Sequence, residues 1–154
     1  YTARISLREI LARYEFRLLP LQLMSAHADL ACTAADVVLV TSGTATLEVA
    51  LCKRPMVISY KISPLTYAYV RRKIKVPHVG LPNILLEKGA VPELLQGRAT
   101  PKRLAAAVAE WYESPQATTD LKQDFHHLPL LLKKDTAALA AQAVLAEAGV
   151  VKAV

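Results

Sequence analysis

The segment Thr41-Ser42-Gly43-Thr44-Ala45-Thr46-Leu47-Glu48 organises the fold, because it follows the apolar run 36–40 and opens a helical pattern that continues to Lys53. A strand that turns through small hydroxylated residues and one glycine into a helix directs several N–H groups without intrahelical partners at one point. Such a point favours an anion, most often a phosphate. The sequence therefore predicts an anion-binding turn between a strand and a helix.

The segments on either side of this turn predict a parallel sheet. The β-branched run 36–40 is typical of a strand that is covered on both faces. After the helix expected at 44–53, the run 55–60 predicts a second strand. Since a strand, a helix and a strand follow one another, a right-handed parallel crossover is expected, as in one half of a doubly wound α/β domain.

The rest of the chain predicts mostly helices, which are marked by apolar spacing, by Ser, Thr or Asp caps and by proline at first helical positions. Helices are expected at 5–14, 25–34, 64–74, 91–96, 101–112, 115–132 and 135–148, an edge strand at 18–24, and an extended segment leading into a loop at 76–83. Because the pattern is helical after residue 100, we expect a sheet domain at 1–113 and C-terminal helices at 114–154.

Composition limits the class of protein. The chain has 154 residues, 53% of them hydrophobic, which is enough for one domain with a core. A net charge of +6 suits phosphate-bearing ligands, anionic lipid or nucleic acid. Few aromatic residues are interleaved with the charges, so a stacking platform for single-stranded nucleic acid is poorly supported. No apolar run reaches the roughly 20 residues that span a bilayer.

Three further features bear on the compartment, on metal binding and on the origin of the chain. Cys32 and Cys52 lack metal-ligand spacing and fit the reduced thiols of a cytosolic protein. His126 and His127 have no second cluster beside them, so no metal site is expected. The chain starts at Tyr1 without a signal-peptide pattern, which we interpret as the start of a fragment cut from a longer protein.

Ligands of open parallel sheets bind beyond the carboxyl ends of the strands, which here are 41–44, 60–63 and the loop near Asn83. The Gly-x-Gly-x-x-Gly fingerprint and the Gly-Lys-Ser/Thr loop are absent, so neither a dinucleotide oxidoreductase nor a P-loop NTPase is indicated. The hydroxyl groups of the turn could equally be helix caps. Lys61 could meet a phosphate or be a solvated lysine, and Asn83 is by default a turn residue.

Glu48 is the sharpest single candidate, because it is the only charged residue between Asp36 and Lys53. Its carboxylate lies one turn beyond the anion-binding turn and could accept hydrogen bonds from sugar hydroxyls, as acidic residues do with nucleotide ribose. The alternative is a first-turn residue that only complements the helix dipole. Burying a charge without a function in so apolar a helix costs free energy, and we therefore favour a binding role.

Five motifs, taken together, resemble the lipid-A-disaccharide synthase family. They are Ser42-Gly43-Thr44-Ala45-Thr46-Leu47-Glu48, Lys53-Arg54-Pro55-Met56-Val57, Tyr60-Lys61-Ile62-Ser63-Pro64, Leu81-Pro82-Asn83 and Pro92-Glu93-Leu94-Leu95-Gln96. The resemblance runs from about Leu18 to the end and covers the C-terminal half of that enzyme. It implies a GT-B glycosyltransferase, in which two Rossmann-like halves enclose the active site. The family transfers 2,3-diacylglucosamine from UDP to 2,3-diacylglucosamine 1-phosphate with inversion and releases UDP, without a metal or another cofactor.

The resemblance assigns donor binding to this chain. Ser42, Gly43, Thr44 and Ala45 would hold the diphosphate, Glu48 would bind the ribose, and Asn83 and Gln96 would line the donor pocket. Lys61 is added to this site from its position at a strand end, where a phosphate could lie. The general base would lie in the N-terminal half, so no catalytic residue is expected in this chain and the chain alone is expected to be inactive.

The resemblance also implies partners and a location. The expected partners are the two lipid-sugar substrates, the cytoplasmic membrane surface, the N-terminal half and a second copy in a homodimer, whereas nucleic acid is not expected. Helices 115–132 and 135–148 would expose apolar faces to the other half or to a second subunit. The location would be cytoplasmic, at the inner face of the inner membrane of a Gram-negative bacterium. A non-catalytic module that binds a nucleotide sugar or a phospholipid is the alternative.

Overall fold

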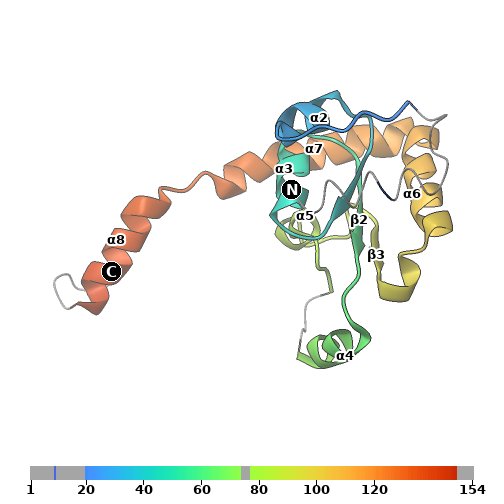
Figure 1. The fold of residues 1–154 in the computed structure, drawn as a ribbon. Coiled ribbons are helices and arrows are strands. Elements are labelled where there is room, and N and C mark those ends of the chain that lie inside the picture. Colours follow the sequence, from blue (N-terminus) through green and yellow to red (C-terminus); the bar gives the residue numbers. More distant parts are fainter. Residues whose placement is uncertain (1–8, 10–19, 74–76, 149–154) are drawn as a thin grey trace.

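The computed structural model describes residues 9, 20–73 and 77–148 (Figure 1). Within them the elements are α2 (Ala28–Ala34), β1 (Val38–Thr41), α3 (Thr44–Leu51), β2 (Met56–Tyr60), α4 (Pro64–Lys73), α5 (Leu81–Leu85), β3 (Glu93–Leu95), the 3-10 helix η2 (Gln96–Arg98), α6 (Pro101–Glu113), α7 (Pro115–Leu132) and α8 (Thr136–Glu147). Apart from Glu9, the helix predicted at 5–14 lies outside the described residues.

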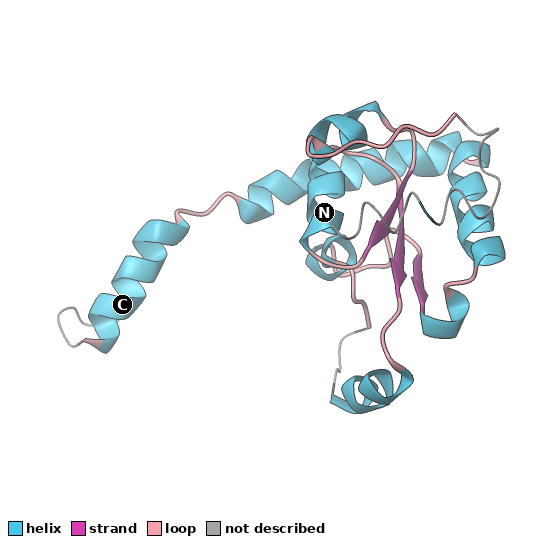
Figure 2. Cartoon of the chain, in the orientation of Figure 1, coloured by secondary structure: helices cyan, strands magenta, loops and turns pink. Residues whose placement is uncertain are grey.

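The three strands form one parallel sheet in the order β1-β2-β3, with helices around it (Figure 2). The predicted parallel α/β architecture is therefore confirmed. Met56 and Ile58 of β2 pack against α3 and α7, while Val57 alternates to the opposite face. All three side chains are fully buried. The central strand β2, which follows the anion-binding turn and its helix, is thus covered on both faces.

The prediction that the strand at 36–40 is covered on both faces is wrong. It forms β1, an edge strand whose exposure alternates, and Leu39 is 52% exposed. A run of β-branched residues favours extended backbone, but whether both faces are covered depends on the neighbouring elements. In the described part of the chain, β1 is paired with β2 along one edge, and no strand pairs with its other edge.

The prediction of a helix at 91–96 is also wrong, because Glu93–Leu95 form the third strand, β3. The Ile58 N–H donates to the carbonyl of Pro92 at 2.9 Å, and Tyr60 pairs with Leu95 in register. Local helical spacing was overridden by pairing with a strand more than thirty residues away. Gln96–Arg98 then form one short 3-10 turn.

Three other boundaries differ from the prediction. Residues 20–24 contain no strand. The helix predicted from Ser25 begins at Ala28, after His27 in a left-handed conformation, and no side chain caps it. The extended segment predicted at 76–83 turns into helix α5 at Leu81, with Pro82 in its first turn, where a missing N–H costs no helical hydrogen bond.

Three of the helices predicted from caps are confirmed together with their caps. Ser63 Oγ accepts from the Thr66 N–H at 3.2 Å at the start of α4, and Thr100 Oγ1 accepts from the Arg103 N–H at 3.4 Å at the start of α6. The Asp135 carboxylate accepts from Ala138 N at 3.0 Å at the start of α8. Each cap satisfies a first-turn N–H that has no intrahelical acceptor.

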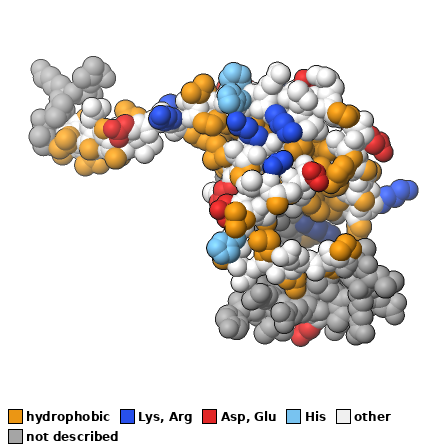
Figure 3. Space-filling model, turned by 90° about the horizontal axis from the view of Figure 1, so that it is seen from above, with side chains coloured by type: hydrophobic (Ala, Val, Ile, Leu, Met, Phe, Trp, Pro, Cys, Tyr) orange, Lys and Arg blue, Asp and Glu red, His pale blue; other side chains and the backbone are white. Residues whose placement is uncertain are grey.

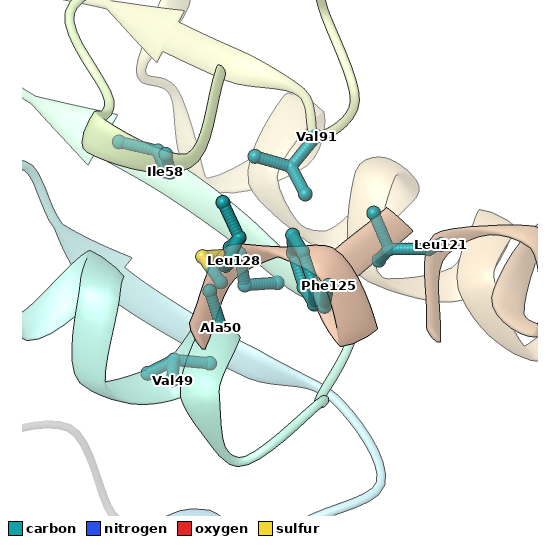
Figure 4. Close-up of a cluster of buried hydrophobic side chains, with 8 residues drawn as sticks. Val49, Ala50, Ile58, Val91, Leu121, Phe125 and Leu128 are labelled. Atoms are coloured by element: carbon teal, nitrogen blue, oxygen red, sulfur yellow. The ribbon is translucent and has the colours of Figure 1, made fainter. Parts of the chain in front are cut away.

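Helix α7 belongs to the core of the sheet domain (Figure 4). Its Leu121, Phe125 and Leu128 lie among the buried side chains of α3 and β2. The expectation that 115–132 exposes an apolar face is therefore wrong for the part of the helix that ends at Leu128. Beyond it, the leucines at 130–132 are exposed, and α8, which extends away from the sheet, has no buried residue (Figure 1). The domain division at residue 114 and the homodimer stay predictions.

Candidate functional site

The carboxyl ends of the three strands bring most of the predicted site residues to one edge of the sheet. The Ser42 N–H donates to the Ser59 carbonyl at 3.2 Å, which extends the β1-β2 pairing into the turn. Tyr60 lies opposite Leu95, so Lys61 and Gln96 leave neighbouring strands at the same level. The turn at 42–45 therefore shares this edge with Lys61 and Gln96.

The turn presents the open amino end of α3. Gly43 is the residue that precedes the helix, and no side chain caps this end. Gly43, Thr44 and Ala45 are exposed, and the Thr46 N–H donates to the Gly43 carbonyl at 3.1 Å. The N–H groups of Thr44 and Ala45 are those that a helix leaves without an intrahelical acceptor. With no acidic side chain in the first turn, the helix end can accept an anion.

The two hydroxyl residues of the turn are not helix caps. Ser42 Oγ instead donates to the carbonyl of Val79 at 3.1 Å and so joins the turn to the segment that leads into α5. Thr44 is exposed at the first helical position. Thr46, which was not predicted as a site residue, is fully buried and donates from Oγ1 to the Gly43 carbonyl at 2.7 Å. Thr46 thereby holds the turn in shape.

Glycine is required at the turn by its backbone. Gly43 has φ 149° and ψ −167°, a region that residues with a Cβ rarely enter. The space around the position is open. A Cβ built on Gly43 would have no heavy atom within 4 Å other than those of Gly43 itself and of the two residues next to it in sequence. The requirement is therefore conformational rather than steric.

Glu48 is exposed and lies in the second turn of α3. The expectation of a buried charge is wrong, and so is the alternative of a first-turn residue that complements the helix dipole. The pKa of the neighbouring Cys32 thiol is raised, first by burial, then by Cys52, and then by the carboxylates of Glu48 and Asp29. Glu48 is thus an exposed carboxylate between the turn and α2, open to a ligand that carries hydroxyl groups.

Lys61 and Gln96 differ in what they can offer a ligand. Lys61 is exposed directly after β2. In the orientation that satisfies its amide, Gln96 donates to the Ile62 carbonyl at 3.0 Å and accepts from the Ile62 N–H at 3.2 Å. Gln96 therefore holds the backbone next to Lys61, while the lysine ammonium faces solvent.

Asn83 lies inside the protein and not in a turn. It is 1% exposed, donates to the carbonyl of Val91 at 2.9 Å and to Glu93 at 2.8 Å, and accepts from the Val91 N–H at 2.9 Å. Both amide N–H groups are used in these bonds. The structure thus gives Asn83 a position behind the edge of the sheet, where it supports the segment before β3, and its part in the donor site stays a prediction.

Glu93 is a second residue of this region that the sequence did not predict as part of the site. Its carboxylate accepts from the N–H groups of Val79 and Gly80, both at 3.0 Å, and from Asn83. Because Ser42 binds the carbonyl of the same Val79, Glu93 is linked through that residue to the anion-binding turn. A lone acidic residue within the apolar run 91–95 was the available signal for a buried, hydrogen-bonded carboxylate.

Metal sites and membrane-spanning helices were looked for in the described residues, which are 9, 20–73 and 77–148. No group of three or more His, Cys, Asp and Glu side chains there is placed to hold a metal ion. Over the same residues, every helix is too short or too polar to cross a bilayer.

Comparison with known proteins identifies the family. A family model for lipid-A-disaccharide synthetase matches residues 3–147. Proteins named lipid-A-disaccharide synthase from Neisseria meningitidis serogroup C and Neisseria gonorrhoeae are each 71% identical over 143 residues, 93% of this chain and 37% of the relative. The protein of that name from Chromobacterium violaceum is 57% identical over 137 residues, 89% of this chain and 36% of its own length. The chain thus spans little more than a third of these relatives, and it belongs to the lipid-A-disaccharide synthase family.

Proposed function

We propose that this chain is the donor-binding part of a glycosyltransferase of lipid A biosynthesis. The reaction would transfer 2,3-diacylglucosamine from UDP to 2,3-diacylglucosamine 1-phosphate and release UDP. Membership of the family supports the reaction. The single structural observation that carries the donor role is the exposed, uncapped amino end of α3 at the carboxyl edge of the sheet.

Each residue of this edge would have its own part in binding. The N–H groups of 43–45 would bind the diphosphate, and the exposed ammonium of Lys61 would add positive charge. The Glu48 carboxylate would accept hydrogen bonds from the ribose. Ser42 and Gln96, which bind the backbone at 79 and at 62, would position the turn and the strand end.

The same groups would stabilise the transition state electrostatically. Negative charge grows on the diphosphate as the bond to the sugar breaks, and fixed N–H donors stabilise that charge without reorganising. The acceptor hydroxyl would lose its proton to a base outside this chain, with inversion at the sugar. We therefore propose that the chain by itself binds UDP but does not transfer sugar.

The other partners are part of the proposal. The acylated acceptor would enter from the inner face of the cytoplasmic membrane, and the rest of the full-length protein would close the site. The exposed apolar residues of α8, including Leu139 and Val144, support packing against that part or against a second copy.

Calorimetric titration of the chain with UDP and with uridine tests the donor role. UDP is expected to bind and uridine to bind far more weakly, because the diphosphate supplies the contacts at the helix end. Glu48→Gln is expected to weaken UDP about tenfold, the effect of losing a charged hydrogen bond. Glu113→Gln removes an exposed carboxylate at the other end of the fold and serves as the matched control.

Equal binding of uridine and UDP would contradict a diphosphate site at α3, and an unchanged affinity in Glu48→Gln would contradict the ribose contact. If the full-length protein transfers sugar and loses this activity when the turn at 42–45 is changed, the result would support an enzyme over a non-catalytic binding module. Turnover by the chain alone would contradict the placement of the base outside it.

A further inference from the structure

A second cationic site lies away from the edge that would bind the donor. Lys53, Thr119, Lys122, Gln123, His126 and His127 line an open hollow of about 500 Å³ between the end of α3 and the side of α7. Lys53 follows the carboxyl end of α3, so the hollow lies toward the amino edge of the sheet, opposite the turn at 42–45. Figure 3 shows Lys, Arg and His side chains gathered on one face of the molecule.

The backbone at Lys53 holds a lysine in a conformation that glycine adopts more easily. Lys53 has φ 55°, and its N–H donates to the Ala50 carbonyl at 2.9 Å, while the Arg54 N–H donates to the Val49 carbonyl at 3.3 Å. These two bonds are those of a Schellman motif, whose left-handed position is usually glycine. The lysine thus ends α3 at some conformational cost and carries its ammonium group toward α7.

That ammonium group contacts a histidine and not an acid. Lys53 Nζ lies 2.8 Å from His126 Nδ1. An ammonium group has donors only, so Nδ1 must accept and the ring proton is placed on Nε2. The remaining Lys53 hydrogens and the His126 Nε2–H are left as donors.

The acidic side chains of α7 are engaged elsewhere. Asp120 accepts from Gln116 at 2.8 Å, and Asp124 pairs with Lys88 at 2.6 Å. Within the described residues neither Lys53 nor Lys122 forms an ion pair, and no carboxylate lines the hollow. One acid, Asp36, lies in the adjoining hollow, together with Arg54 and Lys122. The Thr119 hydroxyl already donates to the Pro115 carbonyl at 3.0 Å. The lining therefore offers ammonium, amide and imidazole donors with no carboxylate among them.

We propose that this hollow binds a phosphate monoester. A dianionic phosphate has three terminal oxygens that accept several hydrogen bonds at once, which matches the lysine, glutamine and histidine donors that line one hollow. The open mouth admits either a soluble phosphate ester or the headgroup of a lipid that carries one. The proposal does not depend on donor binding at α3.

Nuclear magnetic resonance with glycerol 3-phosphate as the probe tests the site directly. The ring signals of His126 and His127 are expected to shift with saturation, and the affinity is expected to fall as salt rises. Lys122→Gln and Lys53→Gln are each expected to weaken binding about fivefold, the effect of one exposed charge contact. Lys133→Gln removes the same charge from the exposed end of α7 and is expected to stay within about twofold of the native chain.

The amide signals of Gly43 and Thr44 report phosphate at the other edge in the same titration. Shifts confined to those amides would overturn the hollow as a site and leave the donor site intact. If Lys133→Gln weakened phosphate binding as much as Lys53→Gln and Lys122→Gln do, the binding would depend only on the net charge of the chain. That result would also overturn the hollow as a site. Circular dichroism of each variant checks that the fold is kept.

Sedimentation with vesicles distinguishes the two sources of the phosphate. Binding to phosphatidic acid in phosphatidylcholine, lost in Lys122→Gln but not in Lys133→Gln, would assign the hollow to a lipid headgroup. Saturable glycerol 3-phosphate binding without vesicle binding would assign it to a soluble ester. The proposal would be overturned if the chain bound neither the vesicles nor glycerol 3-phosphate. It would also be overturned if the chain bound vesicles and neither Lys53→Gln nor Lys122→Gln weakened that binding.

Discussion

Replacing Glu93 by glutamine tests whether the fold depends on the carboxylate that holds the segment before α5. Glu93 accepts from Val79 N at 3.0 Å, from Gly80 N at 3.0 Å and from Asn83 Nδ2 at 2.8 Å, and its side chain is only 10% exposed. Glutamine has the same shape but a single acceptor oxygen. Its amide nitrogen must face at least one of these three N–H donors.

The three hydrogen bonds are not lost equally. The better orientation keeps the oxygen on Gly80 and Asn83 and leaves the Val79 N–H against the new amide, so one charged hydrogen bond, about 2 kcal/mol, is lost. The other two change from charged to neutral acceptors and weaken by about 0.5 kcal/mol each. Together these effects destabilise the fold by about 3 kcal/mol.

Urea unfolding followed by circular dichroism measures this loss. With a slope of about 2 kcal/mol per M, the midpoint is expected to fall by about 1.5 M. Hydrogen exchange at the amides of Val79 and Gly80 is expected to accelerate more than exchange in α6. Glu113→Gln, an exposed carboxylate at the end of α6, is the control and is expected to change stability by less than about 0.5 kcal/mol.

A loss in Glu93→Gln as small as that of the control would contradict this role of the carboxylate. It would mean that the carboxylate contributes no more than a solvated one and that the segment at 78–80 is held by packing and by the Ser42 hydrogen bond to the Val79 carbonyl. A large loss of stability without faster exchange at Val79 and Gly80 would place the effect elsewhere in the protein.

Three other residues give predictions about the turn, the core and a thiol. Gly43→Ala is expected to destabilise the chain by about 1–3 kcal/mol, because φ 149° is strained for alanine even though the new Cβ has open space around it; an unchanged urea midpoint would contradict this conformation. Phe125→Ala removes a fully buried ring from the core and is expected to cost about 3–5 kcal/mol in the same assay, and a cost below about 1 kcal/mol would mean that α7 is not part of that core. The raised pKa of Cys32 means that the unfolded chain loses the thiol proton first, so this stabilisation is present below the pKa of the unfolded thiol and is lost as pH rises through the folded pKa. Alkylation of Cys32 is followed against pH with Cys52 replaced by alanine. Its midpoint is expected to lie above that of the same chain unfolded in urea and to move lower in Glu48→Gln, whereas equal midpoints for the folded and unfolded chains would contradict the shift.

The site was predictable where its signals are local. A strand at 36–40, a glycine turn and a helix were expected from neighbouring residues, and the structure has β1, Gly43 and α3 at those places. The caps at Ser63, Thr100 and Asp135 also act within one helical turn of the residues they bind. Such contacts can be inferred from sequence because both partners lie a few residues apart.

The exposure of Glu48 and the burial of Asn83 could not be predicted in the same way. Glu48 looked buried because its helix is apolar, but it lies on the exposed side of α3, whereas Asn83 looked like a turn residue and is enclosed by Val91 and Glu93. Exposure depends on which elements cover a residue. That information lies in segments distant along the chain.

Short segments of sequence were sufficient for the parallel α/β class, the glycine turn between β1 and α3, and the family, because periodicity, caps and linked motifs are local properties. The folded chain was needed to show that 93–95 is a strand, that α7 completes the core, and that Glu93 connects to the turn through Val79 and Ser42. Strand pairing and buried hydrogen bonds join residues far apart in sequence, so their energies override local preference once the chain is folded.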